Sequence, residues 1–414
     1  RPGQENELTV LVGKGWYRGR LAGWLPGQNS NAALPAALTA ELTLRYPDGH
    51  TDTICTDASW QTAESAVRFS ELYDGETYDA AFEPSVWTPA ALYDGSTDTL
   101  IEQQGEPVRE QERIAPARIF KTPAGETVVD FGQNLTGYVE IALDGAKGEA
   151  VELSHAEVLD KNGNFYTENY RSAKAKYLYF CKDGAQRYKP KLTFYGFRYI
   201  RVDRFPGGAE HAAPENFTAI AVHSDMKRTG YLSCSDPLLN KLFENVIWGQ
   251  KSNFLDVPTD CPQRDERLGW TGDAQVFIRT ACLNFDAERF FTKWLADLAA
   301  DQREDGAVGH VIPNILRQSG SAAWDDAAAI CPWAVYLAYG DPNILRAQFA
   351  SMKKWVDYIT AHTTTRDLWT GGEHYGDWLG LDAPSGSYKG SSREDLIASA
   401  FYAHSTALVI KTGR

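Results

Sequence analysis

The sequence predicts a multidomain protein in which antiparallel β-sandwich domains precede an all-α domain. Its 414 residues allow about two to four domains. Up to residue 225, short β-branched and aromatic runs alternate with Asp-Gly and Asn-Gly turns at residues 144–145, 162–163 and 183–184. Many short strands at this spacing are typical of sandwiches rather than of a parallel sheet. After residue 225 the apolar residues recur at helical spacing, which indicates a change of architecture.

The first 225 residues divide into two expected β-sandwich domains, over residues 1–110 and 111–225. Residues 42–46 and 51–55 flank a Pro-Asp-Gly turn and predict a β-hairpin. A polar stretch with two prolines, residues 104–117, is expected to join the two domains. Further strands are expected over residues 127–131, 138–143, 150–154, 176–180, 192–194 and 199–202.

Residues 226–414 are expected to form a helical domain. The first predicted helix opens after Ser235 and Asp236, which are residue types that cap helix N-termini. The loops between the helices are long, and loops on a rigid scaffold often carry functional sites. The predicted helices cover residues 237–254, 274–283, 287–301, 327–339, 344–360 and 395–410.

Composition excludes several classes of function. The 41 basic and 55 acidic residues give a net charge of −14, which disfavours nucleic acid and anionic membranes as partners and suits a neutral or cationic ligand. No apolar run approaches the 18 or so residues of a transmembrane helix. The six cysteines form no C-x-x-C pair, so buried free thiols are expected rather than a zinc site. No H-E-x-x-H motif or phosphate-binding loop is present, and neither a metal nor a cofactor is expected.

The segment with the strongest chemical signal is residues 256–273. It holds five carboxylates, two arginines and one tryptophan, and its prolines and glycines prevent a continuous helix. One interpretation is a solvated loop with Arg–Asp pairs and a helix cap. The other is a site in which neighbouring carboxyl groups differ in pKa and serve as acid and base. Tryptophans in expected loops at residues 324–326, 331–333 and 376–379 favour a sugar site, because sugars stack on aromatic rings.

Residues 260–273 closely resemble the signature of the bacterial α-L-rhamnosidases, glycoside hydrolase family 78. Residues 129–137 and 194–199 look like the β-sandwich that precedes the catalytic domain in that family, residues 12–19 like its more N-terminal β domain, and residues 376–379 like a barrel loop. The resemblance implies that residues 111–225 are concanavalin-like. It also implies that residues 226–414 are the N-terminal half of an (α/α)6 toroid.

The resemblance implies an inverting exo-glycosidase that releases terminal α-L-rhamnose from rhamnose-containing glycosides or oligosaccharides. Glu266 would be the general acid that protonates the departing oxygen. Asp260, Arg264 and Asp273 would hold the rhamnose hydroxyls and tune Glu266. A water activated by a second glutamate would attack from the opposite face of the sugar, with the two carboxyl groups about 6.5–9.5 Å apart.

The same resemblance assigns the apolar walls of the sugar pocket to Trp270, Trp324 and Trp378. The family's catalytic base lies further along its sequence, so we expect it beyond residue 414. Both ends of the chain resemble cuts, and we expect a fragment that is neither fully stable nor catalytically complete alone. The compartment and the aglycone are left open, and a homo-oligomer is possible.

Two other classes of function remain open. A non-catalytic carbohydrate-binding protein would recognise sugars through its β-sandwiches, although a binder has no need of the carboxylate-rich loop. Another (α/α)6 glycosidase or a polysaccharide lyase would keep the toroid and change the chemistry. Lyases act on uronic acids, which an acidic pocket on a chain of net charge −14 disfavours.

Overall fold

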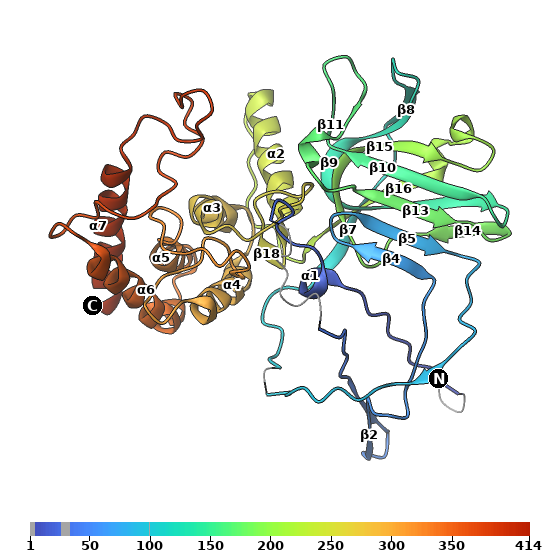
Figure 1. Ribbon diagram of the computed structural model, residues 1–414, viewed down its shortest axis with the longest axis horizontal. Helices are drawn as coiled ribbons and strands as arrows, with labels where there is room; N and C mark the ends of the chain where they lie inside the picture. The colour runs from blue at the N-terminus through green and yellow to red at the C-terminus, as the bar shows by residue number, and fades with distance from the viewer. Residues whose placement is uncertain (1–4, 26–33, 99) are drawn as a thin grey trace. The chain divides into compact units, whose positions relative to one another are not determined.

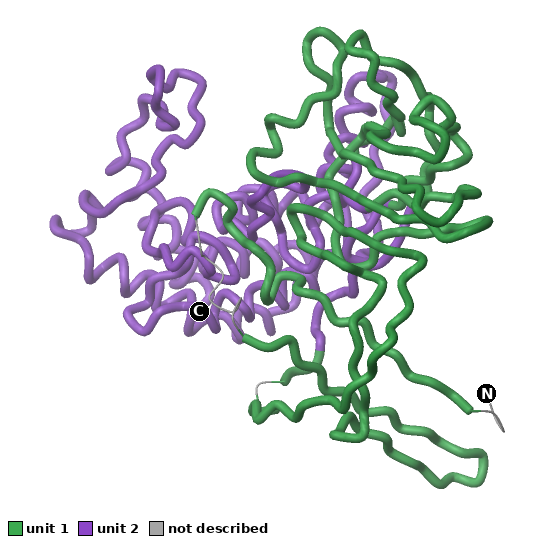
Figure 2. Tube along the Cα trace, turned by 45° about the vertical axis from the view of Figure 1, so that its right-hand side comes forward, with its two compact units in different colours: residues 1–102, 113–134, 138–220 green, residues 103–112, 135–137, 221–414 purple. Residues whose placement is uncertain are grey.

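The computed structural model describes residues 5–25, 34–98 and 100–414 (Figure 1). Residues 1–4, which include the N-terminus that was expected to be a truncated end, lie outside the described residues. The chain divides into two compact units, shown in green and purple in Figure 2. Unit 1 comprises residues 1–102, 113–134 and 138–220, and unit 2 comprises residues 103–112, 135–137 and 221–414.

The N-terminal part of unit 1 holds the expected hairpin. Strands β1 (Glu41–Arg45) and β2 (Thr51–Cys55) pair antiparallel, with Glu41 opposite Cys55. A single-turn helix α1 (Gly15–Arg18) precedes it, and β3 (Gln61–Thr62) pairs with β6 (Thr88–Pro89). The hairpin is confirmed because its Pro-Asp-Gly turn and alternating pattern are local signals.

A ten-stranded sheet follows, in the order β4-β5-β13-β10-β15-β9-β16-β7, with β8 and β14 both paired to β9. Most strand pairings in this sheet are antiparallel, as expected, but β5 and β13 run parallel, with Gly75 opposite Lys176. Strand β11 (Val158–Leu159) pairs with β12 (Phe165–Tyr166) outside this sheet. The sheet strands are β4 (Val67–Glu71), β5 (Gly75–Asp79), β7 (Val108–Ile114), β8 (Arg118–Lys121), β9 (Thr127–Gly145), β10 (Ala150–Ala156), β13 (Lys176–Phe180), β14 (Gly184–Tyr188), β15 (Tyr195–Arg204) and β16 (Phe217–Ser224).

Residues 104–117 hold a strand that was not expected, because β7 within them belongs to the large sheet. Two other expectations about these strands were wrong. Residues 127–131 and 138–143 belong to one strand, β9, which continues through Gly132 and Gly137 at positive φ. Residues 192–194 form no strand, since the N–H of Leu192 donates to the buried carboxylate of Glu76 instead of to a sheet neighbour.

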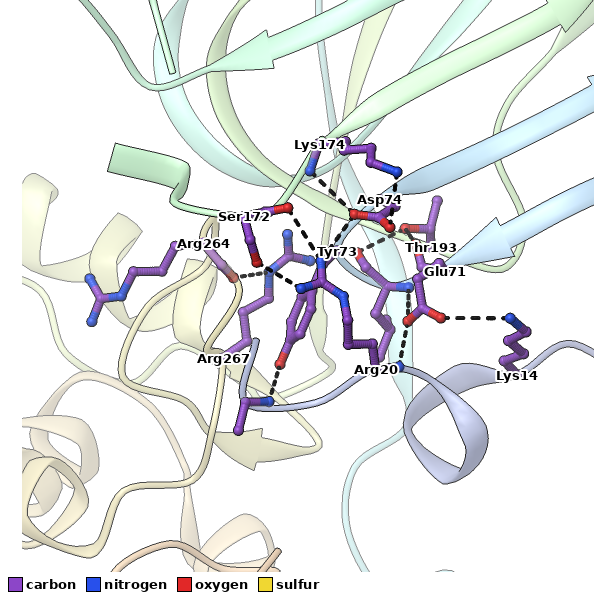
Figure 3. A network of polar contacts seen from close by, with 12 residues as sticks. Lys14, Arg20, Glu71, Tyr73, Asp74, Ser172, Lys174, Thr193, Arg264 and Arg267 are labelled. Carbon is purple, nitrogen blue, oxygen red and sulfur yellow. Dashed lines mark hydrogen bonds and ion pairs between the residues drawn. The ribbon is translucent and has the colours of Figure 1, made fainter. Parts of the chain in front are cut away.

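A polar network attaches the segment after α1 to the turn between β4 and β5 (Figure 3). The backbone N–H of Arg20 donates to Oε1 of Glu71 at 2.8 Å, and its Nη2 donates to Oδ1 of Asp74 at 3.1 Å. Lys14 lies 3.9 Å from the same Glu71 carboxylate. Burial raises the pKa of Glu71, which the Arg20 N–H and Lys14 partly offset. Lys14, Arg20, Glu71 and Asp74 all belong to unit 1.

The helical region of unit 2 confirms the six expected helices. The Asp236 carboxylate caps the first by accepting from the N–H of Leu238 at 2.8 Å. A two-residue hairpin, β17 (Phe254–Leu255) with β18 (Val257–Pro258), was not expected. Unit 1 holds the short 3₁₀ helices Glu168–Tyr170, Ala209–His211 and Pro214–Asn216. The six helices are α2 (Pro237–Asn253), α3 (Thr271–Asn284), α4 (Glu288–Asp301), α5 (Ala327–Tyr339), α6 (Asn343–His362) and α7 (Glu394–Gly413).

Helix α5 is the centre of this region and packs against α3, α4, α6 and α7. Its N-terminal Asp326 is fully buried and accepts hydrogen bonds from Nε1 of Trp355 on α6 at 3.0 Å and from Oγ of Ser405 on α7 at 2.5 Å. One carboxylate therefore joins three helices beneath the loops that precede α3, α5 and α7. None of the described helices has the length and apolarity to cross a membrane. All six cysteines are free thiols, as expected, but Cys55 and Cys234 are exposed and only the other four are buried.

Candidate active site

The carboxylate-rich segment forms a loop between β18 and α3 that closes on itself. The N–H of Asp260 donates to the carbonyl of Leu268 at 3.0 Å, and the N–H of Leu268 donates back to Oδ1 of Asp260 at 2.9 Å. Arg267 takes a left-handed conformation with φ of +53°, which turns the chain back. Residues 260 and 268 are thereby brought together, and the side chains between them are confined to a small volume.

The two arginines of the loop bond to different groups, Arg264 to carboxylates and Arg267 to backbone carbonyls. Nε of Arg264 donates to Oε2 of Glu266 at 2.8 Å, and its Nη2 donates to Oδ2 of Asp260 at 2.9 Å. Arg267 is fully buried and donates to the carbonyl oxygens of Arg264, as Figure 3 shows, and of Gln263. The expected Arg–Asp pair is present between Arg264 and Asp260. The loop is nevertheless not solvated, because the side chains of Asp265, Glu266 and Arg267 are buried.

Trp270 completes the surroundings of Glu266. Its indole Nε1 donates to Oε1 of Glu266 at 3.0 Å, so each carboxylate oxygen of Glu266 has a fixed donor. Trp270 keeps an extended conformation just before α3, which begins at Thr271. Asp273 lies in the first turn of that helix, and solvent reaches its side chain. The loop and the helix start thus present Glu266 in one orientation.

Burial sets the electrostatics of this cluster. Loss of solvent, and then the nearby Glu266 carboxylate, raise the pKa of Asp260 to about 7, against the opposing effect of its hydrogen bonds and of Arg264. Although solvent reaches Asp273, the surrounding protein and Glu266 raise its pKa as well. The neighbouring carboxylates raise the pKa of the Arg264 guanidinium. Two carboxyl groups with raised pKa values, those of Asp260 and Asp273, therefore lie near Glu266.

Trp324 and Trp378 both pack against a residue that was not predicted from the sequence, Tyr375. The ring of Tyr375 lies 4.5 Å from Trp324, 5.3 Å from Trp378 and 6.0 Å from Trp270, measured between centroids. The three predicted wall residues are thus brought together around Tyr375. The only sequence signal for Tyr375 is that it directly precedes the Gly-Asp-Trp run at residues 376–378. The expected loop at residues 331–333 is wrong, because Trp333 lies within α5 and packs on Tyr336.

A histidine and an aspartate support this aromatic group from below. Nδ1 of His310 lies 2.9 Å from the hydroxyl of Tyr375, and burial lowers the pKa of His310 to about 4. Asp325 is fully buried and accepts from the N–H groups of Gly320 and Ser321. Burial also raises the pKa of Asp325 well above its usual range. The imidazole of His310 is therefore uncharged at neutral pH, which suits a neutral ligand.

Among the described residues, one group has the composition of a metal site. Side-chain atoms of Asp260, Cys261 and Glu266 lie within 4.8 Å of one another. The Arg264 guanidinium already bonds to both carboxylates, and burial keeps the pKa of the Cys261 thiol far above its usual value. A bound cation would have to displace a cation and deprotonate a thiol. This donor set does not fit a metal, and the absence of a metal stays a prediction.

Three family models match the chain in succession. The α-L-rhamnosidase N-terminal domain matches residues 1–112, and the bacterial α-L-rhamnosidase concanavalin-like domain matches residues 120–223. The bacterial α-L-rhamnosidase 6 hairpin glycosidase domain matches residues 227–414. The chain belongs to the bacterial α-L-rhamnosidase family. The resemblance seen in residues 260–273 is confirmed, as is the order of sheet-rich domains before a toroid-type helical domain.

Individual rhamnosidases are similar over nearly all of the chain. A curated α-L-rhamnosidase of Streptomyces avermitilis is 37% identical over 99% of this chain, and one of an Alteromonas species is 38% identical over 99%. The crystal structure of an α-L-rhamnosidase from Aspergillus terreus has a TM-score of 0.89 at 35% identity, covering 97% of this chain and 48% of that chain. The Streptomyces avermitilis enzyme complexed with L-rhamnose has a TM-score of 0.88 at 36% identity, covering 96% and 39%. This chain spans only 40% and 46% of the length of those two curated relatives.

Proposed function

We propose that this chain is part of an inverting exo-glycosidase that releases terminal α-L-rhamnose from rhamnosides. The observation that carries the proposal is the environment of Glu266, whose two carboxylate oxygens are held by Arg264 and Trp270 beside a group of aromatic rings. A general acid needs a fixed direction toward the departing oxygen. Aromatic rings supply the apolar face on which a 6-deoxy sugar packs. We also propose that the chain comprises three domains, over residues 1–110, 111–225 and 226–414.

In the proposed reaction, Glu266 gives its proton to the glycosidic oxygen as the bond to the anomeric carbon breaks. Asp260, Arg264 and Asp273 hold the rhamnose hydroxyls. The raised pKa values of Asp260 and Asp273 limit the negative charge around the departing group. A second carboxylate across the ring, about 6.5–9.5 Å from Glu266, activates the attacking water and gives inversion. Trp270, Trp324 and Trp378 exclude bulk water from the sugar.

The test is release of nitrophenol from an aryl α-L-rhamnoside by the full-length protein and its Glu266→Gln variant. Glutamine keeps the shape of the side chain but has no acidic proton, so turnover should be lost while binding of L-rhamnose, followed by calorimetry, persists. Glu304→Gln is the matched control, because Glu304 is an exposed glutamate of the same unit. Full activity of Glu266→Gln would refute the assignment. Rhamnose binding without turnover in the unmodified protein would favour a carbohydrate-binding protein.

A further inference from the structure

Helix α3 carries a buried glycine, Gly272, in its first turn, where alanine would be the better helix former. The φ of Gly272 lies outside the left-handed region, so the backbone conformation does not require glycine there. A Cβ at this position would lie 2.7 Å from both Cδ2 and Cε2 of Trp324 and 2.8 Å from its Nε1. The indole of Trp324 therefore lies directly against the backbone of α3, in space that any side chain at residue 272 would need.

The backbone that carries Trp324 is held at α3 by the residue before it. Nε2 of Gln275, which lies three residues after Gly272 and so on the same face of α3, donates to the carbonyl of Ala323. The N–H of Ala323 donates to Oδ2 of Asp326 at 2.8 Å. Ala323 also holds a φ of +68°, a conformation that persists only where the surroundings impose it. The loop before α5 therefore cannot simply move away from α3 to make room for a larger residue.

The indole of Trp324 also packs against other rings of the proposed site. The centroid of Tyr375 lies 4.5 Å from that of Trp324, and the centroid of Trp378 lies 6.5 Å from it, with the two indoles nearly perpendicular. The hydroxyl of Tyr375 lies 2.9 Å from Nδ1 of His310, which fixes that ring. Because these neighbours and the backbone are fixed, a methyl group at residue 272 would push the indole into the space left for the sugar.

We propose that Gly272 is a positioning residue that sets the width of the sugar pocket, by allowing Trp324 to lie against the backbone of α3. This role rests on the proposed function, in which Trp324 is a wall of that pocket. The three atoms nearest to a Cβ at residue 272 all belong to Trp324, whereas Glu266 is held by Arg264 and Trp270. A side chain at residue 272 should therefore impair binding of the sugar more than proton transfer by Glu266.

The first test is the kinetics of the full-length protein on an aryl α-L-rhamnoside. Gly272→Ala should raise the KM about tenfold, a common effect of adding one methyl group to a packed site, and should change kcat little. Gly249→Ala is the matched control, because Gly249 lies inside α2 and a Cβ there would meet no described atom within 4 Å beyond its neighbours and its own helix. An unchanged KM in Gly272→Ala, with turnover intact, overturns the role of Gly272 and leaves the glycosidase assignment standing.

A double-mutant cycle with Trp324→Ala separates positioning from a general loss of structure. Trp324→Ala should itself raise the KM, and adding Gly272→Ala should raise it no further, because the indole through which Gly272 acts is gone. Additive effects of the two substitutions on the KM would overturn the proposed role.

Thermal unfolding of the same four proteins tests the contact without any substrate. Gly272→Ala should lower the Tm when Trp324 is present and raise it in the Trp324→Ala background, where the better helix former meets no ring. An equal change of Tm in both backgrounds would overturn the positioning role. Absence of both turnover and L-rhamnose binding in the unmodified protein would instead refute the proposed function, and the pocket role of Gly272 with it.

Discussion

The hydroxyl of Tyr375 lies 2.9 Å from Nδ1 of His310, and this contact joins two loops whose members are 65 residues apart in the chain. Burial lowers the pKa of His310 to about 4, so the imidazole is neutral over most of the physiological range. The tyrosine ring is fixed at one end by this contact and at its faces and edges by Trp270, Trp324 and Trp378. One hydroxyl therefore fixes the ring that all three proposed wall residues contact.

The first prediction concerns this hydroxyl. Tyr375→Phe and His310→Ala should each weaken binding of L-rhamnose about fivefold, because one hydrogen bond contributes about 1 kcal/mol. The double variant should be no weaker than the weaker single variant, since both changes remove the same contact. Calorimetry with L-rhamnose measures all three affinities. Tyr231→Phe removes an exposed hydroxyl as a control. Fully additive losses would show that the two residues act independently.

The second prediction tests the fork that holds Asp260 and Glu266. Arg264→Lys should lower kcat/KM for an aryl rhamnoside by about tenfold or more, because an ammonium cannot take the place of Nε and Nη2 at once. Hydrogen bonds to charged groups contribute about 1.5–3 kcal/mol each. Arg366→Lys is the control, since the Arg366 side chain is 94% exposed. An unchanged kcat/KM in Arg264→Lys would mean that the paired geometry is unimportant.

The third prediction is a pH dependence of stability. An acid whose pKa is raised on folding binds more protons in the folded than in the unfolded protein. The raised pKa of Asp260 should therefore lower the free energy of unfolding as pH rises from about 4 to about 7. Asp260→Asn cannot lose a proton, so the stability of the unmodified protein relative to this variant should fall across that interval.

Urea unfolding of both proteins measures this difference at about pH 4.5 and about pH 7.5, which lie near the two ends of the interval. His310, with its lowered pKa, acts with the opposite sign, but it is present in both proteins and cancels in the comparison. A difference in stability that is constant with pH, or that rises, would contradict the raised pKa of Asp260.

The fourth prediction concerns the carboxylate at the start of α5. Asp326→Ala should lower the free energy of unfolding by about 3 kcal/mol, because it leaves Nε1 of Trp355 and Oγ of Ser405 buried without their acceptor. Asp326→Asn retains an acceptor oxygen and should cost clearly less. Thermal unfolding of the two variants checks the order. A Tm of Asp326→Ala equal to that of the unmodified protein would show that the junction of the three helices tolerates the loss of this acceptor.

Local signals predicted much of the architecture. Helix α5 was predicted over residues 327–339, as found, and the first hairpin and the cap at Asp236 were also correct. These features depend on hydrophobic period, turn residues and capping side chains within a few positions along the chain. The family resemblance in residues 260–273 was equally local and is confirmed. The roles of Glu266 and its neighbours stay proposals.

Tertiary structure decided what depends on distant residues. The parallel pairing of β5 with β13 joins segments about a hundred residues apart, and the continuity of β9 through two glycines depends on strands beside it. Tyr375 gains its central place only because the loops before α3, α5 and α7 meet above the same helices. The sequence by itself determined which residue types and local elements are available. Folding alone brought them together, since packing and burial act between residues that the sequence pattern cannot relate.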